Sequence, residues 1–222
     1  MMRSFWHIFQ SEMCLYLRQP QDWLQPMCFY SIIVMLYPLA LTPDPIILRQ
    51  YFASFVWISV LLSSLLSSES FFQADREDGY LEQLVLSSIP LVLAVYAKLL
   101  ACWLVRQLPL ILLTPFLALL FTIDFNTIGL LELSLVFGTP VFVLVGCLGT
   151  SLTIGLRQQG VLLALLMTPI LIPILIFAIS AVEQMQHGLS VSGLLLALAG
   201  TTVLAITLIP WAIAALLKIS LD

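Results

Sequence analysis

Six long apolar runs separated by short polar stretches set the pattern of this chain. They lie at about residues 25–42, 51–68, 92–121, 128–152, 160–181 and 194–217. Each is about as long as, or longer than, the roughly 20 residues that an α-helix, rising about 1.5 Å per residue, needs to cross a bilayer core. Because lipid offers the backbone no hydrogen-bond partner, spans of this kind are expected to be helices. The pattern predicts an all-α polytopic membrane protein with six transmembrane helices in one domain, residues 1–222.

Residues 1–20 have a different pattern. Apolar side chains recur there every four positions on one helical face, at Phe5, Phe9, Met13 and Leu17. Trp6 and Tyr16 belong to residue types that prefer the membrane interface. The segment predicts an amphipathic helix on the membrane surface, with a tail of no fixed structure as the alternative. Pro20 and Pro26 are expected to mark the turn into the first span.

Proline and glycine refine the picture of the spans. The third run, 92–121, is longer than a bilayer requires and is expected to bend or project. Prolines occur within the spans at Pro109, Pro115, Pro140, Pro169, Pro173 and Pro210. They indicate either hinges or kinks that a membrane helix tolerates. Small residues of the fourth span, Gly138, Gly146, Gly149 and Gly155, predict close helix packing, with a partner helix in this chain or in another.

Composition and charge agree with a membrane protein and suggest its orientation. The chain is 61% hydrophobic and 9% charged, and its net charge of −4 argues against a nucleic-acid-binding face. Most Lys and Arg residues fall on the side that holds both termini and the loops 69–91 and 153–159, whereas Arg49 lies on the other side. Cytoplasmic loops are enriched in these residues. Both termini are therefore expected to be cytoplasmic.

The loop 69–91 holds the most conspicuous charged segment. Its acidic residues are Glu69, Asp75, Glu77, Asp78 and Glu82. Gly79 is expected to end one helix, and Tyr80, Leu81, Leu84 and Val85 form an apolar stripe with the spacing of a second, short helix. Such a helix can dock into a groove of a soluble partner subunit. The alternative is a helix that lies at the lipid headgroups without a partner.

Motifs for catalysis are absent from the sequence. It has no G-x-x-x-x-G-K-[ST], H-E-x-x-H or G-x-S-x-G motif, so the chain is expected not to be an enzyme. No C-x-x-C pair or metal-site spacing occurs. Arg106, within the third run, is expected either to face a polar seam between helices or to snorkel to the surface. His187 is either a haem ligand or a surface residue, and Glu132 is the carboxylate that a secondary carrier would use.

Residues 77–84, EDGYLEQL, resemble the E-x-G-x-L-E-x-L coupling-helix signature of ABC-2-type exporter permeases. Further stretches, 60–84, 139–140, 152–163 and 172–178, are similar to the CcmB family of haem exporter B subunits within that group. The resemblance covers nearly the whole chain. It implies that an ATPase-coupling site is formed by Glu77, Asp78, Gly79, Leu81, Glu82, Gln83 and Leu84.

The resemblance also implies the biological setting. Members of the family act in the bacterial inner membrane with a separate ATPase subunit, CcmA, and with CcmC and CcmD, in cytochrome c-type biogenesis. ATP would bind to the partner, haem would be the cargo or would travel on the chaperone CcmE, and two copies of this chain would form the complex. No cofactor is assigned to the chain itself. The alternatives are an ABC-2-type permease for a lipid, polysaccharide or drug, and a secondary carrier.

Overall fold

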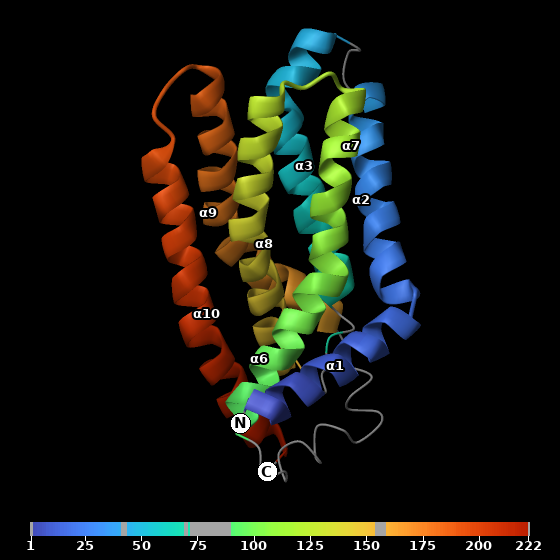
Figure 1. The fold of residues 1–222 in the computed structure, drawn as a ribbon, viewed down its shortest axis with the longest axis vertical. Helices are drawn as coiled ribbons and strands as arrows, with labels where there is room; N and C mark the ends of the chain where they lie inside the picture. Colours follow the sequence, from blue (N-terminus) through green and yellow to red (C-terminus); the bar gives the residue numbers. More distant parts are fainter. Residues whose placement is uncertain (1, 41–43, 69–70, 72–89, 154–158, 222) are drawn as a thin grey trace.

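The computed structural model describes residues 2–40, 44–68, 71, 90–153 and 159–221, and throughout them the regular structure is helical. The elements are α1 (Met2–Arg18), α2 (Gln21–Ala40), α3 (Pro45–Ser68), α6 (Leu91–Cys102), the π-helical turn η1 (Trp103–Gln107), α7 (Leu108–Leu120), α8 (Phe125–Thr153), α9 (Gln159–Gln186) and α10 (Ser192–Leu221). Figure 1 shows them as an elongated bundle with both chain ends at the same end.

The described residues contain six helices long and apolar enough to span a membrane, so the predicted all-α polytopic fold is confirmed. Four of them match the prediction within a few residues at each end. The first two helices begin earlier than predicted, at Gln21 and Ile46 rather than near residues 25 and 51. In α2 the reason is a polar first turn, which holds Gln21 and Asp22 and is helical but does not register as hydrophobic. In α3 the first turn is apolar, and Arg49 and Gln50 after it separated that turn from the predicted run.

The third span is helical throughout, from Leu91 to Leu120, and its irregularity is the π turn η1. At the end of this turn the Leu108 N–H donates to the carbonyl of Trp103, five residues back. Pro109 follows directly; it has no N–H, and its ring would collide with a carbonyl four residues earlier in a regular helix. The wider π turn relieves this conflict.

Helix α8 packs against α3, α9 and α10, and its glycines allow close approaches to two of them. A Cβ on Gly138 would collide with the side chain of Trp57 on α3. One on Gly149 would lie 2.8 Å from the Leu163 side chain on α9. The predicted close packing is therefore confirmed at both positions, and the partners belong to the same chain. Gly155 lies outside the described residues.

Polar side chains also link the spans across long sequence distances. The Tyr30 hydroxyl of α2 lies 2.8 Å from the Thr114 hydroxyl of α7. Trp103 Nε1 donates to the Thr139 hydroxyl of α8 at 3.0 Å, and the Tyr96 hydroxyl donates to the carbonyl of Ile206 on α10 at 2.8 Å. In a bilayer, where apolar contacts with lipid and protein are similar, such bonds help fix which helices pair.

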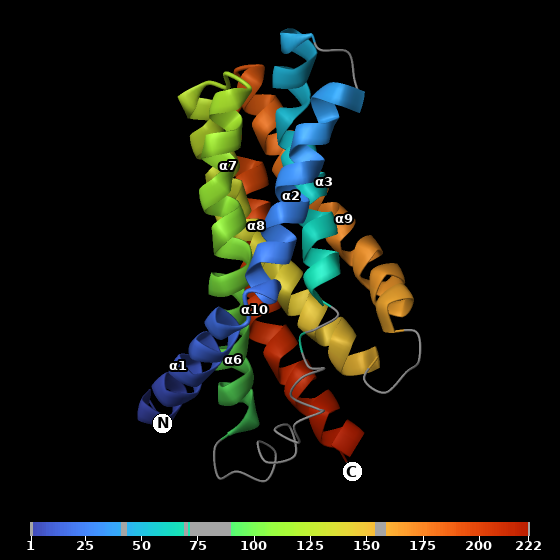
Figure 2. The same cartoon turned by 90° about the vertical axis from the view of Figure 1, so that its right-hand side faces the viewer.

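Helix α1 is not one of the spans. Figures 1 and 2 show it running obliquely past α6 at the end of the bundle where the chain termini lie. The alternative of a tail without fixed structure is therefore wrong. It lies beside α6, the first part of the third span, close to a cluster of buried polar side chains.

Candidate functional site

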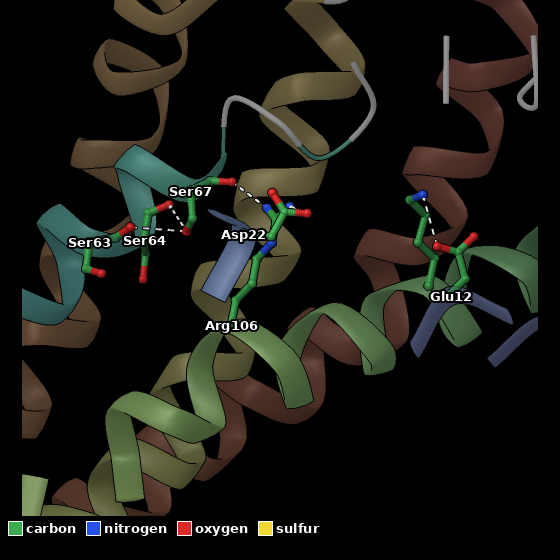
Figure 3. A network of polar contacts seen from close by, with 7 residues as sticks. Glu12, Asp22, Ser63, Ser64, Ser67 and Arg106 are labelled. Carbon is green, nitrogen blue, oxygen red and sulfur yellow. Dashed lines mark hydrogen bonds and ion pairs between the residues drawn. The ribbon is translucent and has the colours of Figure 1, made fainter. Parts of the chain in front are cut away.

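A buried polar cluster, here called the basal junction, joins α1, α2, α3 and the third span near the termini. Its members are Glu12, Tyr16, Asp22, Ser64, Ser67, Lys98, Arg106 and Gln107. Figure 3 shows most of these side chains and the contacts among them. The loop 69–91, which holds the predicted coupling residues, connects α3 to α6, two of the helices that meet here.

Arg106 is the centre of the junction. The residue lies on η1 and is 1% exposed. One terminal nitrogen, Nη1, donates to the carbonyl of Ser67, and the other, Nη2, lies 3.4 Å from the Asp22 carboxylate (Figure 3). The polar-seam interpretation of Arg106 is thus confirmed, and snorkelling to the surface is wrong. The reason is that Asp22 and the end of α3 bring acceptors to the guanidinium inside the bundle.

Two aromatic rings complete the surroundings of Arg106. Its Cζ atom lies 5.3 Å from the centroid of the Tyr16 ring and 4.7 Å from that of Phe71. A cation over an aromatic face at such distances gains about 0.5–2 kcal/mol, the larger value when water is excluded. Arg106 therefore contacts α1, the start of α2 and the chain on both sides of the end of α3.

A second buried ion pair holds α1 to α6. Lys98 Nζ lies 3.3 Å from the Glu12 carboxylate, and both side chains are almost fully buried. Lys98 also lies over the Tyr16 ring, 5.7 Å from its centroid. Burial raises the pKa of the Tyr16 phenol, with Lys98 acting in the opposite direction, so the ring stays neutral between the two cations.

This pair corrects the predicted face of α1. Phe9 and Met13 of the apolar stripe do pack against the core, but Leu17 is 58% exposed. The face turned to the bundle carries Glu12 and Tyr16 as well, at positions three and seven residues beyond Phe9. A hydrophobic stripe did not identify this face because a charged residue with a partner on α6 is part of it. The membrane-surface location of α1 stays a prediction.

Serines of α3 extend the junction into the bundle. Gln107 Nε2 donates to the Ser64 hydroxyl at 2.8 Å, and the Ser63 hydroxyl donates to the carbonyl of Pro26 on α2 at 2.7 Å. Ser67 and Ser68 bond back to carbonyls of their own helix. The sequence signal for this row is the repeat S-S-L-L-S-S at 63–68, which places polar side chains on one face of an otherwise apolar helix.

The predicted coupling residues, Glu77, Asp78, Gly79, Leu81, Glu82, Gln83 and Leu84, lie outside the described residues. The structure does describe the helices on either side of them. The helix before the segment, α3, ends at Ser68 beside Arg106, and the helix after it, α6, carries Lys98. Sequence reasoning missed Glu12, Asp22 and the serines of α3. The only signal in the sequence is that these polar residues interrupt apolar stretches.

The remaining sequence candidates are not brought into this cluster. His187 is exposed in the turn after α9, and Glu132 is half-buried on α8. Among the described residues no three His, Cys, Asp or Glu side chains group as a metal site would require. An open cleft of about 1140 Å³ lies at the opposite end of the bundle, with Asp124, Asn126, Leu130 and Met185 in its lining.

Comparison with known proteins places this architecture in a family. Residues 3–220 match the family described as CcmB protein. The chain is 44% identical over 218 residues to Heme exporter protein B of Haemophilus influenzae, which covers 98% of this chain and 99% of the relative. It is 46% identical over 209 residues to the Pseudomonas aeruginosa protein of the same name, covering 94% of each chain. For the Escherichia coli K12 protein of that name, identity is 40% over 218 residues, covering 98% and 99%. This six-span, multi-pass bacterial membrane protein belongs to the CcmB family.

Proposed function

We propose that this chain is the membrane permease subunit of an ABC transporter complex for cytochrome c-type biogenesis. Relatives named Heme exporter protein B match the chain over nearly their full length. The chain has no nucleotide-binding loop, so ATP would be hydrolysed by a separate subunit, CcmA. The described residues hold an even number of spans, which would place both termini on the same side of the bacterial inner membrane, and the distribution of Lys and Arg supports the cytoplasmic side.

The observation that carries the coupling mechanism is the basal junction. The junction includes residues of α3 and α6, the helices before and after the loop 69–91. It fixes the end of α3 through the contact between Arg106 and the Ser67 carbonyl. A segment that receives force from a motor subunit requires a rigid attachment to the spans. Glu77, Asp78, Gly79, Leu81, Glu82, Gln83 and Leu84 would then meet the ATPase, and the junction would hold the base of that segment.

The cargo step takes one of two forms. Either haem crosses the membrane through the complex, or ATP hydrolysis releases the haem-loaded chaperone CcmE from CcmC, with CcmD in the same assembly. Two copies of the chain would complete the permease. A permease for another cargo, such as a lipid, polysaccharide or drug, is the alternative. Complementation of a strain that lacks its own B subunit, scored by haem-stained c-type cytochromes, separates these cases: failure despite membrane expression would contradict the haem role.

The coupling assignment is tested by the double variant Glu82→Arg, Leu84→Asp. It reverses one charge and places another on the apolar stripe of the predicted docking helix, so both ATPase binding in a pull-down and cytochrome c maturation should be lost. Asp75→Arg is the matched control, because it reverses an acidic residue of the same loop outside the E-x-G-x-L-E-x-L signature. If the double variant binds the ATPase and matures cytochrome c normally, the assignment is wrong.

A further inference from the structure

The environment of Arg106 does more than neutralise a buried charge. A guanidinium buried with a single carboxylate gives little net stability, because its desolvation roughly offsets the attraction, and an apolar side chain of similar size would pack as well. Arg106 instead uses separate nitrogens for two different segments, the Ser67 carbonyl and the Asp22 carboxylate. This arrangement fixes the relative position of those segments.

The contact with Ser67 falls at a special place on α3. The last carbonyls of a helix have no partner within the helix and carry its negative dipole end. Ser67 is next to the last residue of α3, and Phe71, which follows, lies against the same guanidinium. Arg106 thus caps α3 at the point where the chain leaves for the coupling segment.

Helix α1 is attached to Arg106 and Lys98 at two points. Tyr16 lies within 6 Å of both the Arg106 guanidinium and the Lys98 ammonium, and Glu12, one turn earlier, pairs with Lys98. Lys98 and Arg106 are eight residues apart, or about 12 Å along the helix. Two points of attachment prevent a helix from pivoting about either one.

The π turn η1 lies between these attachments and α7. Arg106 and Gln107 are its last residues, and regular helix resumes at Leu108 on the side of α7. π turns are rare in proteins and often mark functional positions. The attachments of α1 and α3 therefore lie on α6 and η1, and α7 lies beyond them.

We propose that Arg106 is a positioning residue that, together with Lys98, fastens α1, the start of α2 and the end of α3 to α6 and η1, so that these parts move as one unit when the coupling segment is displaced. The inference rests on the proposed function for the source of that displacement. It adds α1, an element outside the spans, to the moving part of the permease.

The first test removes the attachment without opening a cavity. Arg106→Met keeps an unbranched side chain of similar length and leaves Asp22 near the partly exposed start of α2. We expect membrane insertion, ATPase binding and ATP hydrolysis to persist, while cytochrome c maturation per ATP hydrolysed falls by about tenfold, within the usual range of coupling between sites. Normal maturation with a docked ATPase would overturn the proposal. Arg18→Met is the control, because it removes an exposed cation from α1 and should leave maturation unchanged.

A second variant keeps the test valid if Arg106→Met does not fold. Arg106→Lys preserves the buried charge and the pairing with Asp22, but a compact ammonium lacks the two separate terminal nitrogens. It should insert normally and still show reduced maturation per ATP hydrolysed. Full activity of Arg106→Lys would mean that charge alone matters, and the positioning role would be wrong.

These outcomes are distinguishable from failure of the proposed function. If Glu82→Arg, Leu84→Asp loses ATPase binding while Arg106→Met matures cytochrome c normally, the permease assignment stands and only the positioning role is wrong. If the Glu82 and Leu84 changes leave ATPase binding and cytochrome c maturation intact, the coupling assignment and this inference are both wrong, while the role in cytochrome c biogenesis stands.

Discussion

The ion pair between Glu12 and Lys98 is predicted to hold α1 against α6, and exchanging the two charges tests this. The pair joins residues 86 positions apart, and its side chains are only 4% and 7% exposed. Lys98→Glu places two carboxylates together in a buried site and should detach α1 from α6. Glu12→Lys does the same with two ammonium groups. Combining both changes restores an ion pair of reversed polarity and should restore the attachment.

The magnitude follows from the geometry. At 3.3 Å and an effective dielectric constant of about 20, the attraction between unit charges is ~5 kcal/mol, and desolvation offsets much of it. Breaking one partner of a buried pair costs about 3–5 kcal/mol. Detachment of α1 limits this loss, because the remaining charge then reaches water. We therefore expect each single variant to lower amide hydrogen-exchange protection of α1 by about 100-fold or more, which corresponds to roughly 3 kcal/mol.

The assay is hydrogen exchange of the purified protein in lipid nanodiscs, with the four proteins of the double-mutant cycle measured side by side. Protection of α8, which carries neither Glu12 nor Lys98, serves as the internal control. A coupling energy of at least about 1.5 kcal/mol is expected for two groups in direct contact. Additive effects, with a coupling energy below about 0.5 kcal/mol, would refute the reasoning that this ion pair holds α1 in place.

Other predictions concern the junction and the helix packing. Asp22→Arg combined with Arg106→Asp should not restore the wild-type thermal stability, because a carboxylate at 106 cannot donate to the Ser67 carbonyl; full rescue would show that only the ion pair matters. Gly138→Ala should lower thermal stability by about 1–3 kcal/mol, because its Cβ would collide with Trp57, whereas Gly129→Ala, at an open position, should not destabilise. Tyr16→Phe should keep or raise the melting temperature, because the buried phenol oxygen has no hydrogen-bond partner among the described residues, and a clear loss would contradict this.

The sequence by itself determined the fold class. A run of about 20 apolar residues has few alternatives to a spanning helix, because an unpaired backbone group in lipid costs several kcal/mol. The periodicity of residues 1–20 likewise predicted a helix, and the glycines of the fourth span predicted its close packing. These properties are local, since each depends on residues within one helix. The coupling residues 77–84, which rest on a resemblance, stay a prediction.

The tertiary structure alone decided which polar groups meet. From the sequence, Arg106 could either face a polar seam or snorkel to the surface. No local pattern indicated Asp22 or the Ser67 carbonyl as its partners. Glu12 interrupts an apolar face in the sequence, yet it is buried because α1 crosses α6 beside Lys98. Hydropathy and periodicity describe one helix at a time. The pairing of charges depends on where helices cross, which only the packing of the whole bundle fixes.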